Sequence, residues 1–278
     1  MNTLTILEDE KAFRERTNLI FDEAHKRAKK LPDHTVQVIP GEALFKTIQE
    51  AIESIQDASE KLQYQVLIGP GTYNERVKTK EYIHVVGAGV GETRINQHGF
   101  EDKYVGAIQA MGNGGLSNLT INATGPHPET QEVKDFNCIA ILMQTPGRYH
   151  ISAVNIHSAD NKNKGVNVRR ISNKIGKQTG LLLISNCNIV AMATGEDSNS
   201  VGIEAFYEGS SYSLDFCVIE AGENDLGIMT ADGATLTVGS STITGQIFAL
   251  YDADGKSTIT ANQCTINGPI SPGVIVNP

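Results

Sequence analysis

One short pattern of alternating side chains recurs along the chain from residue 104 onward. In each copy a small or apolar residue is followed by a mostly polar one and then by isoleucine, which is typical of a β-strand with one buried face. The six copies are Leu119-Thr120-Ile121, Val154-Asn155-Ile156, Cys187-Asn188-Ile189, Cys217-Val218-Ile219, Ser241-Thr242-Ile243 and Cys264-Thr265-Ile266. A second strand pattern precedes most of them, in Gly106-Ala107-Ile108, Ile139-Ala140-Ile141, Val201-Gly202-Ile203, Leu226-Gly227-Ile228 and Phe248-Ala249-Leu250.

The spacing of the copies indicates a solenoid. Successive copies are separated by 35, 33, 30, 24 and 23 residues, and the shortest intervals match one coil made of two short strands and their turns. We therefore predict an all-β solenoid, a right-handed parallel β-helix, over residues 61–278. Stacking places equivalent residues of neighbouring coils about 4.8 Å apart. It therefore builds an inner ladder from Leu119, Val154, Cys187, Cys217, Ser241 and Cys264.

This ladder gives the cysteines a structural explanation. Three of the four cysteines lie on it, where they fill a narrow core as small apolar side chains. No pair has metal-ligand spacing, and an even count in a chain of this length does not indicate a disulfide framework. We predict neither a metal nor a cofactor. The recurring Asp232-Gly233 and Asp254-Gly255 pairs are interpreted as turns rather than as a calcium site.

The wide intervals of the early coils leave room for two loops, at residues 122–136 and 158–179. Long loops on a solenoid usually project from one side and build its working face. The second loop carries Lys162, Lys164, Arg169, Arg170, Lys174 and Lys177 with no acid between them. On a chain of net charge −9 it either guides an anionic ligand, with Arg169 as a binding residue, or is a solvated loop.

The open N-terminal end of a solenoid needs a cover. Residues 7–30 form an amphipathic pattern rich in Glu, Lys, Arg and Ala, and a second apolar face runs through Leu44, Phe45, Ile48, Ala51, Ile52 and Ile55. We predict two helices there. The expected organisation is an N-terminal α-helical cap over residues 1–60, packed on the β-helix of residues 61–278.

The start of this β-helix resembles the pectinesterase family. The resemblance rests on Phe45-x-Thr47-Ile48-x-x-Ala51-Ile52, a strand, Gly71-Thr72-Tyr73-x-Glu75-x-Val77, another strand and Gly87-x-Gly89, and covers roughly residues 36–97. It implies a pectinesterase-like or pectin lyase-like β-helix whose first coil is covered by a short helix. We expect these residues themselves to build the cap.

The catalytic phrases of that family are mostly missing. The resemblance implies two aspartates, one attacking an ester carbonyl and the other donating a proton, with glutamines for the oxyanion and an orienting arginine. Here the position of the first aspartate falls on Ile203, with Glu204 one residue later, and that offset turns a side chain to the other face. Asp225 matches the second aspartate, whereas the Trp-Gly-Arg phrase has no counterpart in a chain without tryptophan.

A lateral groove can still be predicted from the alternation. If Ile108, Ile141, Ile203, Ile228 and Leu250 point inward, then Gln109, Leu142, Glu204, Met229 and Tyr251 form an outward column. Gln144 and Phe206 lie two residues further along their strands on the same face. Glu204 and Asp225 are the candidate catalytic residues, and Gln109, Gln144, Arg169, Phe206, Met229 and Tyr251 are the candidate binding residues. The alternative is that loops or helices cover this column, which would make it packing.

Three functions stay open. The first is a diverged pectinesterase-like protein that binds or hydrolyses a carbohydrate. The second is an intracellular cyclase, isomerase or lyase acting on a small, partly apolar molecule in the groove. The third is a non-catalytic binding or structural β-helix. With 23 Lys and Arg against 32 Asp and Glu, no nucleic-acid partner is expected. The sequence shows no membrane span and no secretory signal, which favours the cytoplasm, or secretion if a leader has been removed.

Overall fold

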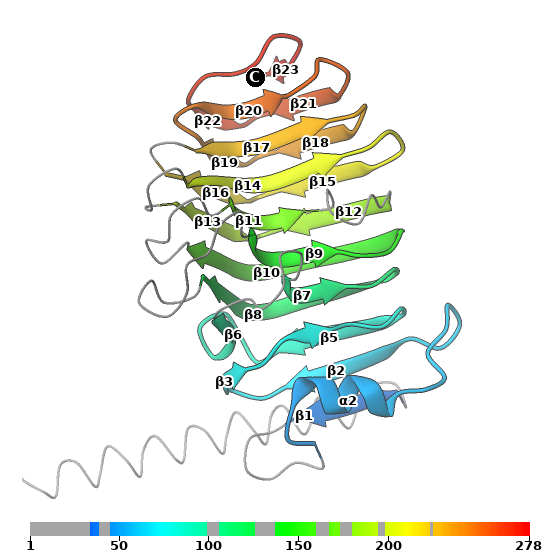
Figure 1. The fold of residues 1–278 in the computed structure, drawn as a ribbon. Helices are drawn as coiled ribbons and strands as arrows, with labels where there is room; N and C mark the ends of the chain where they lie inside the picture. The colour runs from blue at the N-terminus through cyan, green and yellow to red at the C-terminus, as the bar shows by residue number, and fades with distance from the viewer. Residues whose placement is uncertain are drawn as a thin grey trace, which may run out of the picture. The chain divides into compact units, whose positions relative to one another are not determined.

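The computed structural model describes residues 34–38, 45–98, 106–125, 137–159, 167–172, 180–193, 198–222 and 225–278. The chain divides into two compact units, Met1–Thr35 and Val36–Pro278, and all described residues except His34 and Thr35 belong to the second. The predicted helix at 7–30 lies outside the described residues. In the second unit, parallel strands stack coil upon coil (Figure 1).

The strands of the described residues form two parallel sheets. The first, called here the groove sheet, has seven strands in the spatial order β20 (Phe248–Asp252), β17 (Leu226–Ala231), β14 (Asn199–Phe206), β11 (Asn167–Ser172), β9 (Asn137–Met143), β7 (Gly106–Ala110) and β4 (Val77–Lys78).

The second, called here the large sheet, has 16 strands. Its main path is β1 (Thr35–Val38), β2 (Tyr64–Ile68), β5 (Ile83–Gly87), β8 (Gly114–Thr124), β10 (Gly147–Ala159), β12 (Gly180–Ser185), β15 (Ser211–Asp215), β18 (Thr235–Gly239), β21 (Thr258–Asn262) and β23 (Ile275–Asn277). The remaining strands form its second wing: β3 (Gly71–Asn74), β6 (Thr93–His98), β13 (Asn188–Met192), β16 (Val218–Ala221), β19 (Thr242–Thr244) and β22 (Thr265–Asn267).

A left-handed residue turns the chain from the main path into the second wing in each of six coils. These residues have φ between 44° and 55°, and they are Asn118, Ala153, Asn186, Phe216, Ser240 and Gln263. Each directly precedes a residue of the predicted inner ladder. Positive φ is uncommon outside glycine and is favoured mainly by Asn among the residues found here. The corner is therefore imposed by the stacking of coils more than by local preference.

The predicted core is confirmed. Strand pairing and backbone hydrogen bonds align the inner ladder in the expected order, and all of it is buried except the partly exposed Cys264. The second inward column is fully buried and also in register: Ile108, Ile141, Ile171, Ile203, Ile228 and Leu250. The four cysteines are free thiols.

One loop prediction was wrong. Residues 158–179 do not form a single loop, because β11 lies within them and supplies Ile171 to the core. The pair Arg169-Arg170 interrupts the apolar alternation of this strand, so that the pattern resembles a basic loop. Pairing with β9 and β14 on both sides stabilises the strand despite its charge.

A short helix, α2 (Ile48–Ser54), packs against β2 and β4 at the first coil (Figure 1). Thr47 is its N-cap, and in a capping box its hydroxyl accepts the backbone N–H of Glu50 while the Glu50 carboxylate accepts that of Thr47. Glu75, from the family-like segment after β3, accepts hydrogen bonds from the backbone N–H of Ile48 at 2.9 Å and of Gln49 at 3.0 Å. Glu75 of the resemblance motif thus holds the N-terminus of α2 at the first coil. None of the described helices has the length and apolarity to cross a bilayer.

Candidate functional site

The outward column of the groove sheet is in the predicted register. Gln109 pairs with Leu142, Glu204 with Met229, and Met229 with Tyr251. The column also contains Ser172, which lies between Leu142 and Glu204. Ser172 was not predicted, because the sequence of β11 resembles a basic loop.

The middle of this column is covered. Glu204 is only 2% exposed and Leu142 1%, whereas Gln109, Met229 and Tyr251 are partly exposed. The Ser172 hydroxyl donates a hydrogen bond of 2.6 Å to the Glu204 carboxylate. Hydrogen bonding is what makes a buried carboxylate tolerable, so this contact contributes to packing the strands as well as to any chemistry of Glu204.

Asp225, the other candidate acid, lies beside Ser200 rather than beside Glu204. The strand register puts Met229 opposite Glu204, so Asp225 is four positions away, roughly 13 Å at 3.3 Å per residue. Asp225 is fully buried, and one carboxylate oxygen accepts the backbone N–H of Ser200. The other oxygen has no hydrogen-bond partner among the described residues, and it faces Gly222, where an added Cβ would lie 2.7 Å from it.

The open part of the groove sheet is a hollow of about 290 Å³ at one end of the column. The rings of Phe248 and Tyr251 stack in its wall with centroids 4.7 Å apart and planes 22° apart. Ile247 beside them is 48% exposed. The lining combines apolar and neutral polar side chains, from Asn199, Ser200, Val201, Leu226, Met229, Ile247, Phe248 and Tyr251.

A break in alternation brings Phe248 and Tyr251 to the same face although they are three residues apart. On the neighbouring strand β17 the equivalent break lies at Gly227, where an added Cβ would meet the core side chain of Ile243 at 2.8 Å. Gly227 and the next residue, Ile228, therefore both face inward. Only a very small side chain fits such a position, and β20 has Ala249 there, fully buried. Strict alternation places Phe248 in the interior, so the pattern does not predict it as a groove residue.

None of the other candidate side chains that the structure describes lines this hollow. Phe206 is 4% exposed and packs near the ring of Tyr207, with centroids 6.1 Å apart. The backbone of Gln144 bonds to Ala110 just after β9. The backbone of Arg169 pairs within β11, and its side chain lies outside what the structure describes. The hollow thus contains two of the predicted residues, Met229 and Tyr251.

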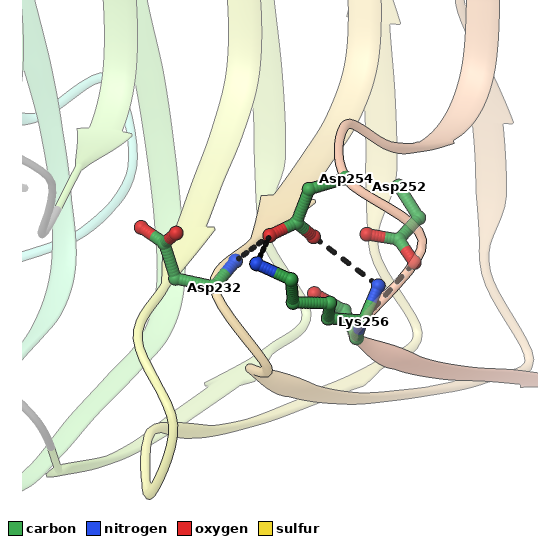
Figure 2. A network of polar contacts seen from close by, with 5 residues as sticks. Asp232, Asp252, Asp254 and Lys256 are labelled. Atoms are coloured by element: carbon green, nitrogen blue, oxygen red, sulfur yellow. Dashed lines mark hydrogen bonds and ion pairs between the residues drawn. The ribbon is translucent and has the colours of Figure 1, made fainter.

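The recurring aspartates form turns, as predicted (Figure 2). The Asp254 carboxylate accepts backbone N–H bonds from Asp232 at 3.1 Å and Lys256 at 3.2 Å, and pairs with the Lys256 ammonium at 3.4 Å. Asp252 accepts the backbone N–H of Ser257. Asp232 and Gly255 have positive φ. The carboxylate oxygens of Asp252 and Asp254 therefore accept hydrogen bonds from the backbone of two stacked turns. Across the described residues, no group of three or more His, Cys, Asp or Glu is placed to hold a metal ion.

Solved pectin methylesterases share this architecture. The enzyme PemA from Erwinia chrysanthemi has a TM-score of 0.55 at 13% identity, over 88% of this chain and 93% of that one. A pectin methylesterase in complex with a hexasaccharide gives 0.55 at 12% identity over the same shares. The enzyme from carrot gives 0.51 at 13% identity over 88% of each chain. The sequence matches no protein-family model and no curated protein.

These comparisons show a pectin methylesterase-like parallel β-helix and confirm the predicted fold class. At 12–13% identity the similarity concerns the fold. What the site does has to be argued from its own residues.

Proposed function

We propose that this protein binds a carbohydrate in the hollow of the groove sheet, with a sugar ring placed on the Phe248–Tyr251 pair. The observation that carries the proposal is this stacked aromatic pair in an open hollow beside neutral polar groups. A pyranose ring presents an apolar C–H face surrounded by hydroxyl groups. An aromatic ring offers a flat apolar surface of matching size and immobilises few rotatable bonds.

The neighbouring side chains suit the rest of such a ligand. Asn199 in the lining carries an amide that can donate to and accept from sugar hydroxyls. Met229 and Leu226 add an adaptable apolar floor. The described residues of the lining include no charged side chain, and the chain carries a net charge of −9. A neutral or esterified saccharide is therefore preferred to a polyanionic one.

The geometry favours binding over ester hydrolysis. A nucleophilic carboxylate and a proton donor must both reach one ester group, within hydrogen-bond distance of the reacting atoms. Glu204 and Asp225 are about 13 Å apart along the strands by the 3.3 Å rise, and both are buried. Glu204 is also engaged by Ser172. Neither carboxylate lines the hollow.

The test is calorimetric titration of the full chain with hexagalacturonides, fully methylated or unmethylated. We expect the methylated form to bind more tightly. Tyr251→Ala and Phe248→Ala should each weaken binding about tenfold, equivalent to about 1.4 kcal/mol. Phe216→Ala is the matched control, because that ring is 63% exposed on the large sheet. Absence of binding, or equal affinity in the Tyr251→Ala variant, would remove the proposal.

Methanol release separates binding from hydrolysis. We expect wild type and the Glu204→Gln and Asp225→Asn variants to release methanol from methylated pectin at the same background rate. Release by the wild type that either substitution abolishes would instead assign ester hydrolysis to these two residues.

A further inference from the structure

A second and larger hollow lies on the outer face of the large sheet, near the N-terminal coils. Its volume is about 610 Å³, within the usual range for small-molecule sites. It is separate from the groove sheet, because its strand residues come from β5, β8, β10 and β12. The lining residues are Glu60, Gln63, Tyr82, His84, Asn113, Gly114, Arg148, His150 and Leu183.

Two histidines in this hollow lie on either side of Gly115, a residue without a side chain. His84 and His150 both pair with Gly115, one from each neighbouring strand, so the three positions form one outward column. A Cβ on Gly115 would lie 2.9 Å from Nδ1 of His84 and 2.7 Å from the carbonyl oxygen of His150. Because Gly115 has no Cβ, the His84 ring occupies part of the space above it. A hydroxyl-bearing neighbour, Ser185, lies 3.4 Å from Nε2 of His150.

Arg148 is the cation among the described lining residues of the hollow. Its backbone N–H donates to the Asn113 side chain at 2.9 Å, which fixes the start of the strand and leaves the exposed guanidinium to the hollow. Within the described part of the chain the Arg148 side chain forms no ion pair. Glu60 is the opposing charge at the rim. Burial, and then the nearby His150, lower the pKa of His84, so that ring is a neutral hydrogen-bonding group near pH 7.

We propose that this hollow binds a small hydroxylated carboxylate, such as a sugar acid. The Arg148 guanidinium would hold the carboxylate through two parallel hydrogen bonds. The imidazoles of His84 and His150, with the Asn113 amide, would bind hydroxyl groups over the space left by Gly115. The Tyr82 ring and Leu183 supply apolar surface.

The residues favour a carboxylate over the two nearest alternatives. A phosphate carries more charge than a carboxylate, and Arg148 is the single cation among the described lining residues. A transition metal needs three or four protein ligands for a stable site, and among the described residues no such group is present. A neutral sugar would form no charge-assisted pair of hydrogen bonds with the exposed Arg148 guanidinium.

The experiment is calorimetric titration of the full chain at pH 7 with D-glucuronate, D-glucose and inorganic phosphate. We expect glucuronate to bind at least tenfold more tightly than either other probe. Arg148→Gln should weaken glucuronate binding at least tenfold and leave the chain folded, since the role of the Arg148 backbone is retained. His84→Ala should weaken it several-fold.

Lys256→Gln is the matched control, because this lysine is an exposed cation in a turn on another coil, and its affinity for glucuronate should equal that of the wild type. Equal binding of glucose and glucuronate would overturn the proposal, as would tighter binding of phosphate or an unaffected Arg148→Gln variant. Loss of binding in Lys256→Gln would also overturn it, since that result indicates attraction by net charge alone. Tyr251→Ala should bind glucuronate normally, which separates this site from the groove sheet.

Discussion

The neighbouring residues Val218 and Ile219 on β16 allow the inward and outward faces of one strand to be compared directly. Ile219 is fully buried and stacks between Ile189 and Ile243, whereas Val218 is 39% exposed. Truncating a buried isoleucine to alanine costs about 2–5 kcal/mol, depending on how far the surroundings close the cavity. Across the core, Ile219 faces Gly202, where an added Cβ would meet it at 2.7 Å.

Gly202 determines how much stability the Ile219→Ala substitution should cost. Gly202 has no side chain that can move into a cavity, so Ile219→Ala should cost about 3–5 kcal/mol, in the upper part of the range. Val218→Ala should change the free energy of unfolding by less than about 0.5 kcal/mol. Urea unfolding followed by circular dichroism measures both. Equal costs, or a larger cost at Val218, would refute the assignment of inward and outward faces.

Three further outcomes follow from the described contacts. Glu75→Ala removes the acceptor for the N–H groups of Ile48 and Gln49 and should cost about 2–3 kcal/mol, with the exposed Glu220→Ala near zero in the same urea titration. His84 has a pKa below its ordinary 6.5, so unfolding takes up a proton at acidic pH and stability should fall between pH 7.5 and 5.5. His84→Gln should show a smaller fall, and an equal fall would refute the pKa shift.

The architecture was predictable because stacking repeats one chemical requirement in every coil. Equivalent core positions of successive coils are filled by Ile121, Ile156, Ile189, Ile219 and Ile243. A local sequence pattern therefore predicts a contact between residues that are far apart in the chain. The order of the outward column followed from the same reasoning. Ser172 was not predicted as a member of this column, because two arginines interrupt the apolar alternation of its strand. Pairing on both sides stabilises that strand.

The sites were less predictable than the fold. The stacked pair of Phe248 and Tyr251 depends on consecutive inward residues, a backbone irregularity that strict alternation does not reveal. The hollow on the large sheet depends on His84 and His150 meeting over Gly115, three residues from three different coils. No local sequence pattern marks any of these three residues as part of a site. Such sites are visible only once the register is known.

Both proposed sites depend on the register in which neighbouring coils stack. A disulfide between two neighbouring coils tests this stacking most directly. Ser213 on β15 lies opposite Thr237 on β18, and their side chains point outward. Paired residues on neighbouring strands are about 4.8 Å apart, within disulfide range, whereas Ser213 and Thr235 are about 8 Å apart by the same spacings. Mild oxidation should give the Ser213→Cys/Thr237→Cys variant one intramolecular disulfide by mass spectrometry, and Ser213→Cys/Thr235→Cys none. A bond in the second variant and none in the first would show that the coils stack in a different register.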